Sequence, residues 1–259
     1  MRFYSARPLN SRSFCRFKPK ESLNGTILIV TSIFAHRGYH ATWPENSVAA
    51  VAAARDVGAD GVEVDVWLSA DKYLVVNHDR TLRGRSIPAA TLAQLREAGE
   101  VATLDEVLAS SGSMRINVEI KSTRSAPYNV RVAQAVAMFL DESPVSNQCL
   151  VSSFSLAVCD EVRRVSPERR VGWLVTRRAA HAVLDHVVDS RFTSAHFAFS
   201  RVTPSVAARA RELGVELHVW TPNLRRDIER MLDLGVGAVI TDDVLLAQDL
   251  RARHRSKEK

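Results

Sequence analysis

The sequence has no apolar stretch that approaches the roughly 20 residues needed by a membrane-spanning helix. The best candidate, residues 26–35, is about half that length and leads directly into a His-Arg-Gly triplet. We therefore expect no transmembrane segment and predict a cytoplasmic location. The first 20 residues are rich in arginine and serine and lack acids, which is typical of targeting segments and leaves export open. The plainer interpretation of residues 1–30 is a flexible N-terminal extension.

Cysteine is scarce. The chain has three, Cys15, Cys149 and Cys159, without the short spacings of a metal site and in an odd number that cannot pair completely. Cys149 and Cys159 lie among apolar residues and are predicted to be buried thiols. A reducing compartment is the default expectation.

Two phosphate-binding signatures are also missing. No Gly-x-Gly-x-x-Gly turn follows the first predicted strand, and no Walker loop occurs in the chain. Internal repeats and linkers rich in glycine and serine are absent as well. Residues 31–250 are therefore predicted to form one domain, and the sequence carries no signal for an oligomeric state.

The net charge of +6 is concentrated at the two ends of the chain. Residues 1–20 hold six cations and no acid, and residues 251–259 hold five cations and one acid. Between them, residues 21–250 carry 24 Lys and Arg against 28 Asp and Glu. A nucleic-acid partner is not expected for this body, because phosphate-backbone binders carry basic patches. Residues 251–259 are predicted to be a basic tail.

Short β-branched runs alternate with amphipathic stretches along the body. Eight strand–helix units in about 230 residues predict a single α/β domain with the (β/α)8 TIM-barrel fold, and a doubly wound sheet is the second choice. Only 24 residues separate His78 from Thr103, so the insertion after the second strand should be short. The predicted strands are 33–36, 61–67, 116–120, 149–152, 170–174, 194–197, 216–220 and 238–240.

Capping signals support the helices between these strands. The segment "ENSVAAVAAARDVG" follows Pro44, offers Asn46 as a possible N-cap, and ends at Gly58. Thr103 is followed three residues later by Glu106, which is the spacing of a capping box.

The second strand carries two acids on one face. Glu63 and Asp65 are two residues apart, so both side chains point into the barrel while Val62, Val64 and Val66 point to the helices. Adjacent buried carboxylates repel and lose solvation, and a divalent cation removes both costs. Oxygen ligands favour Mg²⁺ or Ca²⁺. The alternative is a pair of acids neutralised by Arg or Lys neighbours.

The third strand repeats this arrangement. In "INVEIKS", Asn117, Glu119 and Lys121 share one face of the strand. Glu119 can be a third oxygen ligand, and Lys121 offers a point charge to a phosphate oxygen. An acid on the strand next to Glu63 and Asp65 favours the metal site over simple ion pairs.

Two histidines flank these acids in the sequence. His36 ends the first predicted strand and His78 follows an apolar run, which suits a general acid and a general base. Arg37 can bind a phosphate with two hydrogen bonds, and Gly38 permits the turn. The histidines interpreted as structural are His181, His186, His196 and His254.

The seventh strand, "ELHVWTPN", places His218 and Trp220 on the inner face. Trp220 is either the wall of a substrate pocket or a core-filling side chain. A metal site, two imidazoles and two cations together indicate phosphate-ester hydrolysis. They do not name the ester.

From Phe34 to Asp243 the sequence resembles the glycerophosphodiester phosphodiesterase family. The resemblance rests on ordered motifs: "HRG", "PENS", "GADGVEVDVWLSADKYLVVNHD", "TLDEVL", "NVEIK", "SSF", "WTPN" and "GVGAVITDD". It implies a TIM barrel that hydrolyses a small-molecule glycerophosphodiester to sn-glycerol 3-phosphate and an alcohol. It also implies one divalent cation, Mg²⁺ or Ca²⁺.

The resemblance further implies a role for each candidate residue. The implied metal ligands are Glu63, Asp65 and Glu119. His36 and His78 would be the acid/base pair, and Arg37, Lys121 and Trp220 would contact phosphate or substrate. The nucleophile can be the glycerol 2-hydroxyl, through a cyclic phosphate, or water.

The sequence departs from the family in the short segment after His78. That departure leaves the headgroup preference open, because loops at this face of a barrel set specificity. The rival interpretations are a lysophospholipase D or sphingomyelinase D-like enzyme on the same barrel, and an inactive barrel that only binds.

Overall fold

The computed structural model describes residues 20–21, 27–28 and 30–257. The chain divides into two units, residues 1–30 and residues 31–259. In the first unit, β1 (Lys20–Glu21) and β2 (Ile27–Leu28) pair in antiparallel fashion. The predicted flexible extension of residues 1–30 lies mostly outside the described residues.

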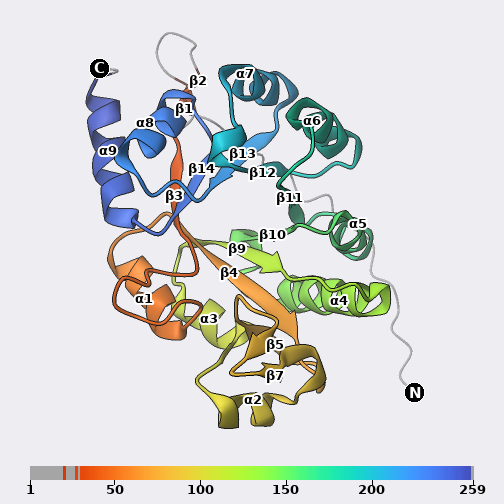
Figure 1. Ribbon diagram of the computed structural model, residues 1–259. Coiled ribbons are helices and arrows are strands. Elements are labelled where there is room, and N and C mark those ends of the chain that lie inside the picture. The colour runs from red at the N-terminus through yellow and green to blue at the C-terminus, as the bar shows by residue number, and fades with distance from the viewer. Residues whose placement is uncertain (1–19, 22–26, 29, 258–259) are drawn as a thin grey trace. The chain divides into compact units, whose positions relative to one another are not determined.

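Eight parallel strands close into a barrel in the second unit (Figure 1). Each strand pairs with the next along the chain, and β3 pairs with both β14 and β4 to complete the ring. All eight predicted strands are confirmed to within one residue at each end. They are β3 (Ser32–Ala35), β4 (Gly61–Leu68), β9 (Arg115–Ile120), β10 (Cys149–Ser153), β11 (Arg170–Val175), β12 (Ser194–Ala198), β13 (Glu216–Trp220) and β14 (Ala238–Thr241).

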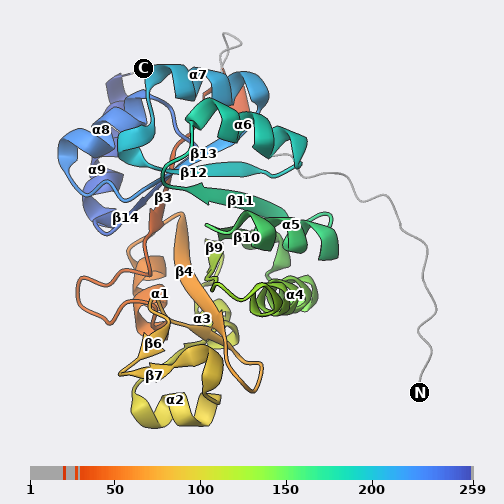
Figure 2. The same ribbon diagram turned by 45° about the vertical axis from the view of Figure 1, so that its right-hand side comes forward.

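A helix follows every barrel strand, and Figure 2 shows α4 to α7 along the outside of the sheet. Together with the closure of the ring through β3, this alternation confirms the predicted TIM barrel, and the closure excludes an open doubly wound sheet. The helices are α1 (Val48–Asp56), α3 (Leu104–Ser110), α4 (Ala126–Glu142), α5 (Leu156–Val165), α6 (Ala180–Asp189), α7 (Pro204–Leu213), α8 (Arg225–Asp233) and α9 (Val244–Lys257). Short 3₁₀ turns are η1 (Ile87–Ala89), η2 (Ser146–Gln148) and η3 (Phe199–Arg201). Among the described residues, none of the helices has the length and apolar character needed to cross a membrane.

The helix starts show one confirmed cap and one correction. Thr103 and Glu106 form the predicted capping box at α3. Asn46 was expected to cap α1, but Ser47 is the N-cap and its hydroxyl accepts a hydrogen bond from the amide of Ala50 at 3.0 Å. The expectation was wrong because the Asn46 side chain bonds to Asp65 instead.

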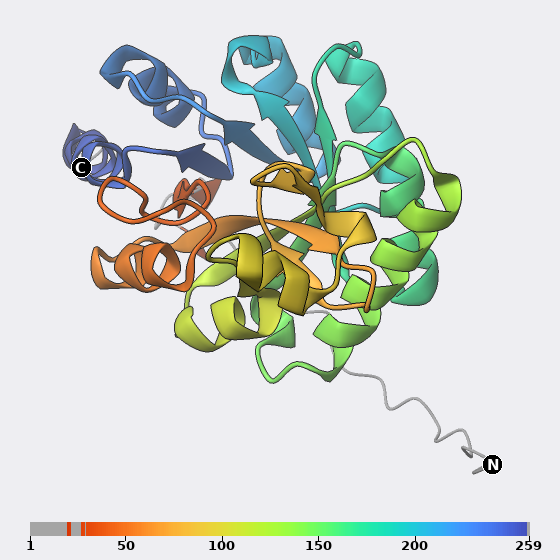
Figure 3. The same cartoon turned by 60° about the horizontal axis from the view of Figure 1, so that its bottom comes forward.

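The short insertion after β4 adds two strands to the end of β4, where it continues past its barrel partners. Its β5 (Leu74–Val76) pairs antiparallel with the end of β4, and β8 (Ala102–Thr103) pairs with β5. Between them lie a β6–β7 hairpin, the η1 turn and helix α2 (Leu92–Ala98) (Figure 3). The two strands of the hairpin are β6 (Thr81–Leu82) and β7 (Arg85–Ser86).

The last helix runs through the predicted basic tail. α9 continues to Lys257, so residues 251–257 are helical and not a separate tail. Arg251 pairs with Asp60 and donates to the carbonyl of Thr31 at 3.0 Å. These contacts hold the end of the helix against the start of β3 and explain why the helix does not stop at residue 250.

The barrel has an apolar outside layer and a largely polar inside. The valines of β4 are fully buried in the core between strands and helices. Inside the ring, Phe34, Ala238 and Ile240 form a small apolar cluster against Trp220. The remaining interior holds buried polar and charged side chains, among them Glu63, Asp65, Asn117, Glu119, Ser152, His196 and His218.

Candidate active site

Three buried acids meet inside the barrel as predicted. Glu63 and Asp65 come from β4 and Glu119 from β9, and the strand register places Asp65 beside Glu119. One oxygen of each carboxylate lies within 4.8 Å of the others, and the residues are only 3%, 1% and 7% exposed. The set offers oxygen donors only, which is the chemistry of a hard divalent cation.

Both interpretations of these acids contribute to the site. Lys121 Nζ lies 2.7 Å from Asp65 Oδ1 and 2.6 Å from Glu119 Oε1, so the ion-pair alternative is partly realised. Asn46 donates to the other oxygen of Asp65 at 2.8 Å. Glu63 Oε1, however, is buried and has no hydrogen-bond partner among the described residues. An unpartnered buried carboxylate oxygen next to two more acids fits a bound cation.

The electrostatics point in the same direction. Burial, and then the charges of Asp65 and Glu119, raises the pKa of Glu63 well above its usual value. Burial and Asp65 raise the pKa of Glu119 to about 7. Lys121 is itself desolvated, yet its two carboxylate neighbours raise its pKa and keep it charged. The raised pKa values of Glu63 and Glu119 indicate that the single charge of Lys121 does not offset three buried carboxyl groups, which a divalent cation would do.

The His-Arg-Gly turn follows β3 and closes over these acids. Arg37 and Gly38 both have left-handed backbone angles, φ +57° and +87°. A Cβ on Gly38 would lie 2.6 Å from that of Ala50, so only glycine fits beside α1. In this turn the Arg37 backbone amide donates a hydrogen bond to Glu63 Oε2 at 3.0 Å. The Arg37 guanidinium forms an ion pair with Glu45 at 2.9 Å.

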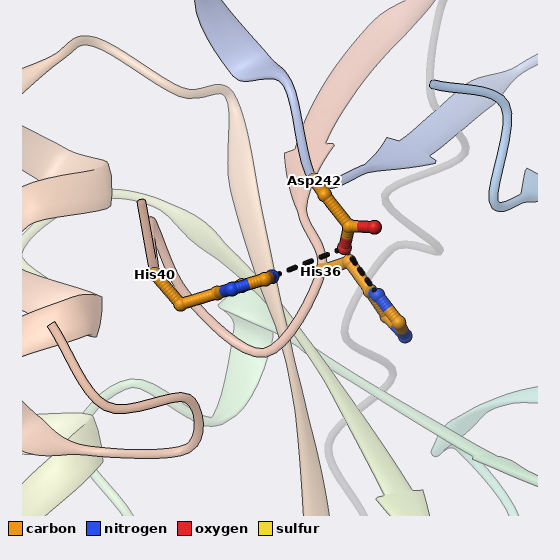
Figure 4. Close-up of side chains that lie close together, drawn as sticks. All are labelled: His36, His40 and Asp242. Atoms are coloured by element: carbon orange, nitrogen blue, oxygen red, sulfur yellow. Dashed lines mark hydrogen bonds and ion pairs between the residues drawn. The ribbon is translucent and has the colours of Figure 1, made fainter. Parts of the chain in front are cut away.

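His36 is held by an acid from the opposite end of the barrel sequence. Asp242 directly follows β14, which pairs with β3, so the two residues are neighbours across the barrel closure. Its Oδ1 lies 2.7 Å from His36 Nδ1 and 3.1 Å from His40 Nε2 (Figure 4). The other oxygen accepts from Asn223 at 2.5 Å. Burial alone would raise the pKa of Asp242, but the bonds from the histidines and Asn223 lower it.

An ionised Asp242 fixes the proton of His36. A carboxylate only accepts hydrogen bonds, so His36 must carry its hydrogen on Nδ1. Its Nε2 is then free and lies 4.0 Å from Glu63 Oε2, facing the acids. An imidazole in this tautomer can accept a proton at the site.

In the part of the chain that the structure describes, the His78 and Trp220 side chains form no hydrogen bond or ion pair with the three acids. The backbone just before His78 is fixed next to the site. The amide of Asn77, the residue after β5, donates a hydrogen bond to the carbonyl of Asp65 at 3.0 Å. The His78 side chain contacts Asp79 at 2.9 Å and is 38% exposed. Trp220 lies edge-on to Phe154, with ring centroids 5.6 Å apart, and its buried Nε1 has no partner among the described residues.

Four residues that hold this network carried no predicted role in the site: His40, Asn46, Asn223 and Asp242. Three of them lie in the motifs "PENS", "WTPN" and "GVGAVITDD", which support the family resemblance without assigning a role to these side chains. His40 lies close to His36 in the sequence and carries no signal of its own. The two described cysteines, Cys149 and Cys159, are buried and free as predicted.

The sequence model of the glycerophosphoryl diester phosphodiesterase family matches residues 36–246, which include all eight candidate residues. This chain belongs to that family. The family comprises phosphoric diester hydrolases, and its match spans the barrel from the His-Arg-Gly turn to the start of α9. The predicted resemblance is confirmed.

Curated members of the family match most of the chain. A glycerophosphodiester phosphodiesterase of Caldanaerobacter subterraneus subsp. tengcongensis is 30% identical over 232 residues, which cover 82% of this chain and 94% of the relative. A glycerophosphodiester phosphodiesterase of Bacillus altitudinis is 27% identical over 237 residues, covering 82% of this chain and 95% of the relative.

Solved structures of the family share the fold. The glycerophosphodiester phosphodiesterase of Parabacteroides distasonis has a TM-score of 0.79 at 26% identity and covers 89% of this chain and 99% of its own. That of Thermotoga maritima has a TM-score of 0.72 at 29% identity, covering 85% and 98%. An Oleispira antarctica phosphodiesterase, solved with the product sn-glycerol-3-phosphate, has the same fold with a TM-score of 0.77 at 22% identity, covering 85% and 96%.

Proposed function

We propose that this chain hydrolyses glycerophosphodiesters to sn-glycerol 3-phosphate and an alcohol, with one Mg²⁺ or Ca²⁺ at the acid cluster. The observation that carries the proposal is the pairing of an oxygen-only acid cluster with an imidazole whose free nitrogen faces it. Family membership supplies the substrate class.

Glu63, Asp65 and Glu119 would hold the cation. When bound, it supplies positive charge that stabilises the developing negative charge on a phosphate oxygen. The buried Glu63 Oε1, which has no partner in the described part of the chain, supports this assignment. Lys121 remains a second positive charge beside the same acids.

The chain's own residues provide the proton transfers. His36, with its hydrogen held on Nδ1 by Asp242, takes a proton from the attacking hydroxyl at Nε2. His78, which is partly exposed beyond β5, protonates the leaving alcohol. Arg37 and Lys121 orient the phosphate oxygens, and Trp220 forms the wall of the glycerol pocket beside Phe154.

The first test is glycerol 3-phosphate release from glycerophosphocholine and glycerophosphoethanolamine. The protein is treated with a chelator and then supplied with Mg²⁺ or Ca²⁺. We expect release only with a cation, and its loss in Glu63→Gln. The matched control is Glu212→Gln, because Glu212 lies exposed on α7. Equal release by both variants would refute the assignment of the acids.

The same assay separates the two possible nucleophiles. Attack by the glycerol 2-hydroxyl produces a cyclic phosphate before glycerol 3-phosphate, whereas direct attack by water does not. Phosphorus NMR during turnover distinguishes the two routes, because the cyclic diester has its own resonance.

A second candidate function is hydrolysis of a lysophospholipid on the same barrel. Three exposed aromatic side chains that follow the barrel strands β3, β4 and β10 favour it, because an acyl chain could contact them: Trp43, Tyr73 and Phe154. A higher kcat/KM for lysophosphatidylcholine than for glycerophosphocholine would select this candidate. The sphingomyelinase D alternative is not favoured, because the described cysteines are free and form no disulfide loop.

A further inference from the structure

Exposed apolar side chains gather where the barrel strands end. Trp43, Tyr73 and Phe154 follow β3, β4 and β10, and they are 50%, 51% and 43% exposed. Leu224 follows β13 and is 55% exposed. The carboxyl ends of the parallel strands meet at one face, which is also the face of His36 and Asp242. We call these four side chains the apolar rim, and they include every exposed Phe, Tyr and Trp of the described residues.

Exposed cations lie between the members of the apolar rim. Lys72 follows β4, Arg124 follows β9, and Arg177 and Arg178 follow β11. None of the four has a carboxylate within ion-pair distance in the part of the chain that the structure describes. Because strands succeed one another round the barrel in chain order, apolar and cationic side chains alternate around the mouth.

The charge of the body is divided between its faces. The segments that join each barrel strand to its helix carry eleven Lys and Arg against seven Asp and Glu. The rest of residues 31–250 carries thirteen against twenty. The strand-to-helix segments therefore carry a net positive charge although the body as a whole is negative, and the three acids Glu63, Asp65 and Glu119 lie buried beneath them.

We propose that the mouth of the barrel docks on an anionic lipid bilayer. Aromatic side chains favour the headgroup region of a bilayer, where an apolar ring meets a wet surface. Lysine and arginine near an anionic leaflet are attracted to it within a Debye length. The alternation of both kinds of side chain around one face matches this partner, and the active site then faces the lipid.

A bilayer fits the whole arrangement better than water or a nucleic acid does. Single exposed apolar residues are normal on soluble proteins, but here the exposed aromatics share one face with cations that lack a carboxylate partner among the described residues. A nucleic acid would use the cations and could stack on aromatics, but it would leave Leu224 in water. A bilayer offers an apolar surface to Leu224 and the aromatic side chains, and anionic headgroups to the cations.

The experiment is co-sedimentation of the full chain with vesicles of phosphatidylcholine alone or with about 25% phosphatidylglycerol. Residues 1–20 carry six cations of their own, so binding by the wild type is not sufficient. The charge test is Arg124→Glu with Arg177→Glu. Its matched control is Arg191→Glu with Arg255→Glu, which are exposed and lie towards the opposite end of the barrel.

The apolar test uses Trp43→Ser with Leu224→Ser. Its control is Met138→Ser with Val188→Ser, two exposed side chains on the outer helices α4 and α6. We expect each mouth variant to lose about tenfold in partition onto anionic vesicles, while the control variants stay within about twofold of the wild type. High salt should weaken binding of the wild type.

Two outcomes would overturn the proposal. One is equal vesicle binding by the mouth and control variants, and the other is binding to a single-stranded oligonucleotide without binding to vesicles. The readout does not depend on catalysis. Hydrolysis of dissolved glycerophosphocholine by the variant with Arg124→Glu and Arg177→Glu is expected to be unchanged, so failure of docking and failure of the proposed function are distinguishable.

Discussion

Nδ1 of His36 lies 2.7 Å from Oδ1 of Asp242, although 206 residues separate them in the chain. The pairing of β3 with β14 brings them together, and the His36 amide donates to the carbonyl of Thr241 at 3.0 Å. The same oxygen of Asp242 also accepts from His40. Asp242 is therefore a positioning residue for the proposed proton acceptor.

Asp242→Asn should lower kcat by about 10²-fold or more, with a small effect on KM, because an amide can present its NH₂ group to His36 and select the wrong tautomer. The measurement is the pH profile of kcat, which should lose its lower limb or shift. Asp243→Asn is the matched control, since Asp243 is exposed and its Oδ1 accepts from the Leu246 amide at the start of α9. Equal kinetics for the two variants would remove Asp242 from the mechanism.

A bound divalent cation should stabilise the folded protein. At 100 times its Kd a ligand that binds only the folded state adds about 2.7 kcal/mol to the free energy of unfolding. We expect Ca²⁺ or Mg²⁺ to raise the Tm of the wild type, and not that of Glu119→Gln. The pKa of Glu119 is about 7 without a cation, so the stabilisation should weaken as pH falls below that value. An unchanged response in Glu119→Gln would contradict the acid cluster as the metal site.

Removal of Lys121 should destabilise the protein most when no cation is bound. Lys121→Met leaves Asp65 and Glu119 without their shared partner, and loss of one member of a buried ion pair costs about 3 kcal/mol. The check is urea unfolding in chelator and in excess Ca²⁺. A cation should recover part of the loss, because it supplies positive charge to the same carboxylates.

Lys72→Met is the control for this prediction. Lys72 is exposed on the same face and has no ion pair in the described part of the chain. Its substitution should leave the free energy of unfolding within about 0.5 kcal/mol of the wild type in both conditions. A cation that restores nothing to Lys121→Met would argue that Lys121 and the metal do not share the acids.

Much of the fold and part of the site followed from local patterns. Period-two alternation placed Glu63, Asp65 and Glu119 inside the barrel, because neighbouring residues of a strand face opposite sides. The strand boundaries could be predicted for another local reason. Each run of β-branched residues ends at a polar segment. The roles of these acids in catalysis stay predictions.

The contacts that long-range closure creates could not be read from the sequence. Asp242 meets His36 only because the last strand pairs with the first, and a local pattern does not contain that pairing. Asn46 has the residue type of a helix cap, yet the neighbouring Asp65 offers its side chain a buried partner. The continuation of α9 past residue 250 likewise depends on Asp60, which lies far away in the chain.

Two buried histidines inside the barrel should make stability depend on pH. His196 and His218 are 0% and 1% exposed, with ring centroids 4.5 Å apart. Burial lowers the pKa of both, most strongly for His196, although a bond to Glu216 partly opposes the shift at His218. Their Nδ1 atoms have no partner among the described residues, so protonation in the folded state gains no hydrogen bond there.

The sign follows from proton binding in the two states. Below the unfolded pKa of about 6.5 the unfolded chain takes up protons that the folded protein does not, so the free energy of unfolding falls as pH decreases. Each histidine contributes a slope of about 1.4 kcal/mol per pH unit until its folded pKa is reached. The unfolded histidine is only partly protonated between about pH 6.5 and 5.5, so we expect His196→Asn to reduce the slope measured by urea unfolding in that range by about 1 kcal/mol per pH unit. His181→Asn, at an exposed site on α6, should leave the slope as in the wild type, and a slope unchanged in both variants would show that His196 is not a source of the acid sensitivity.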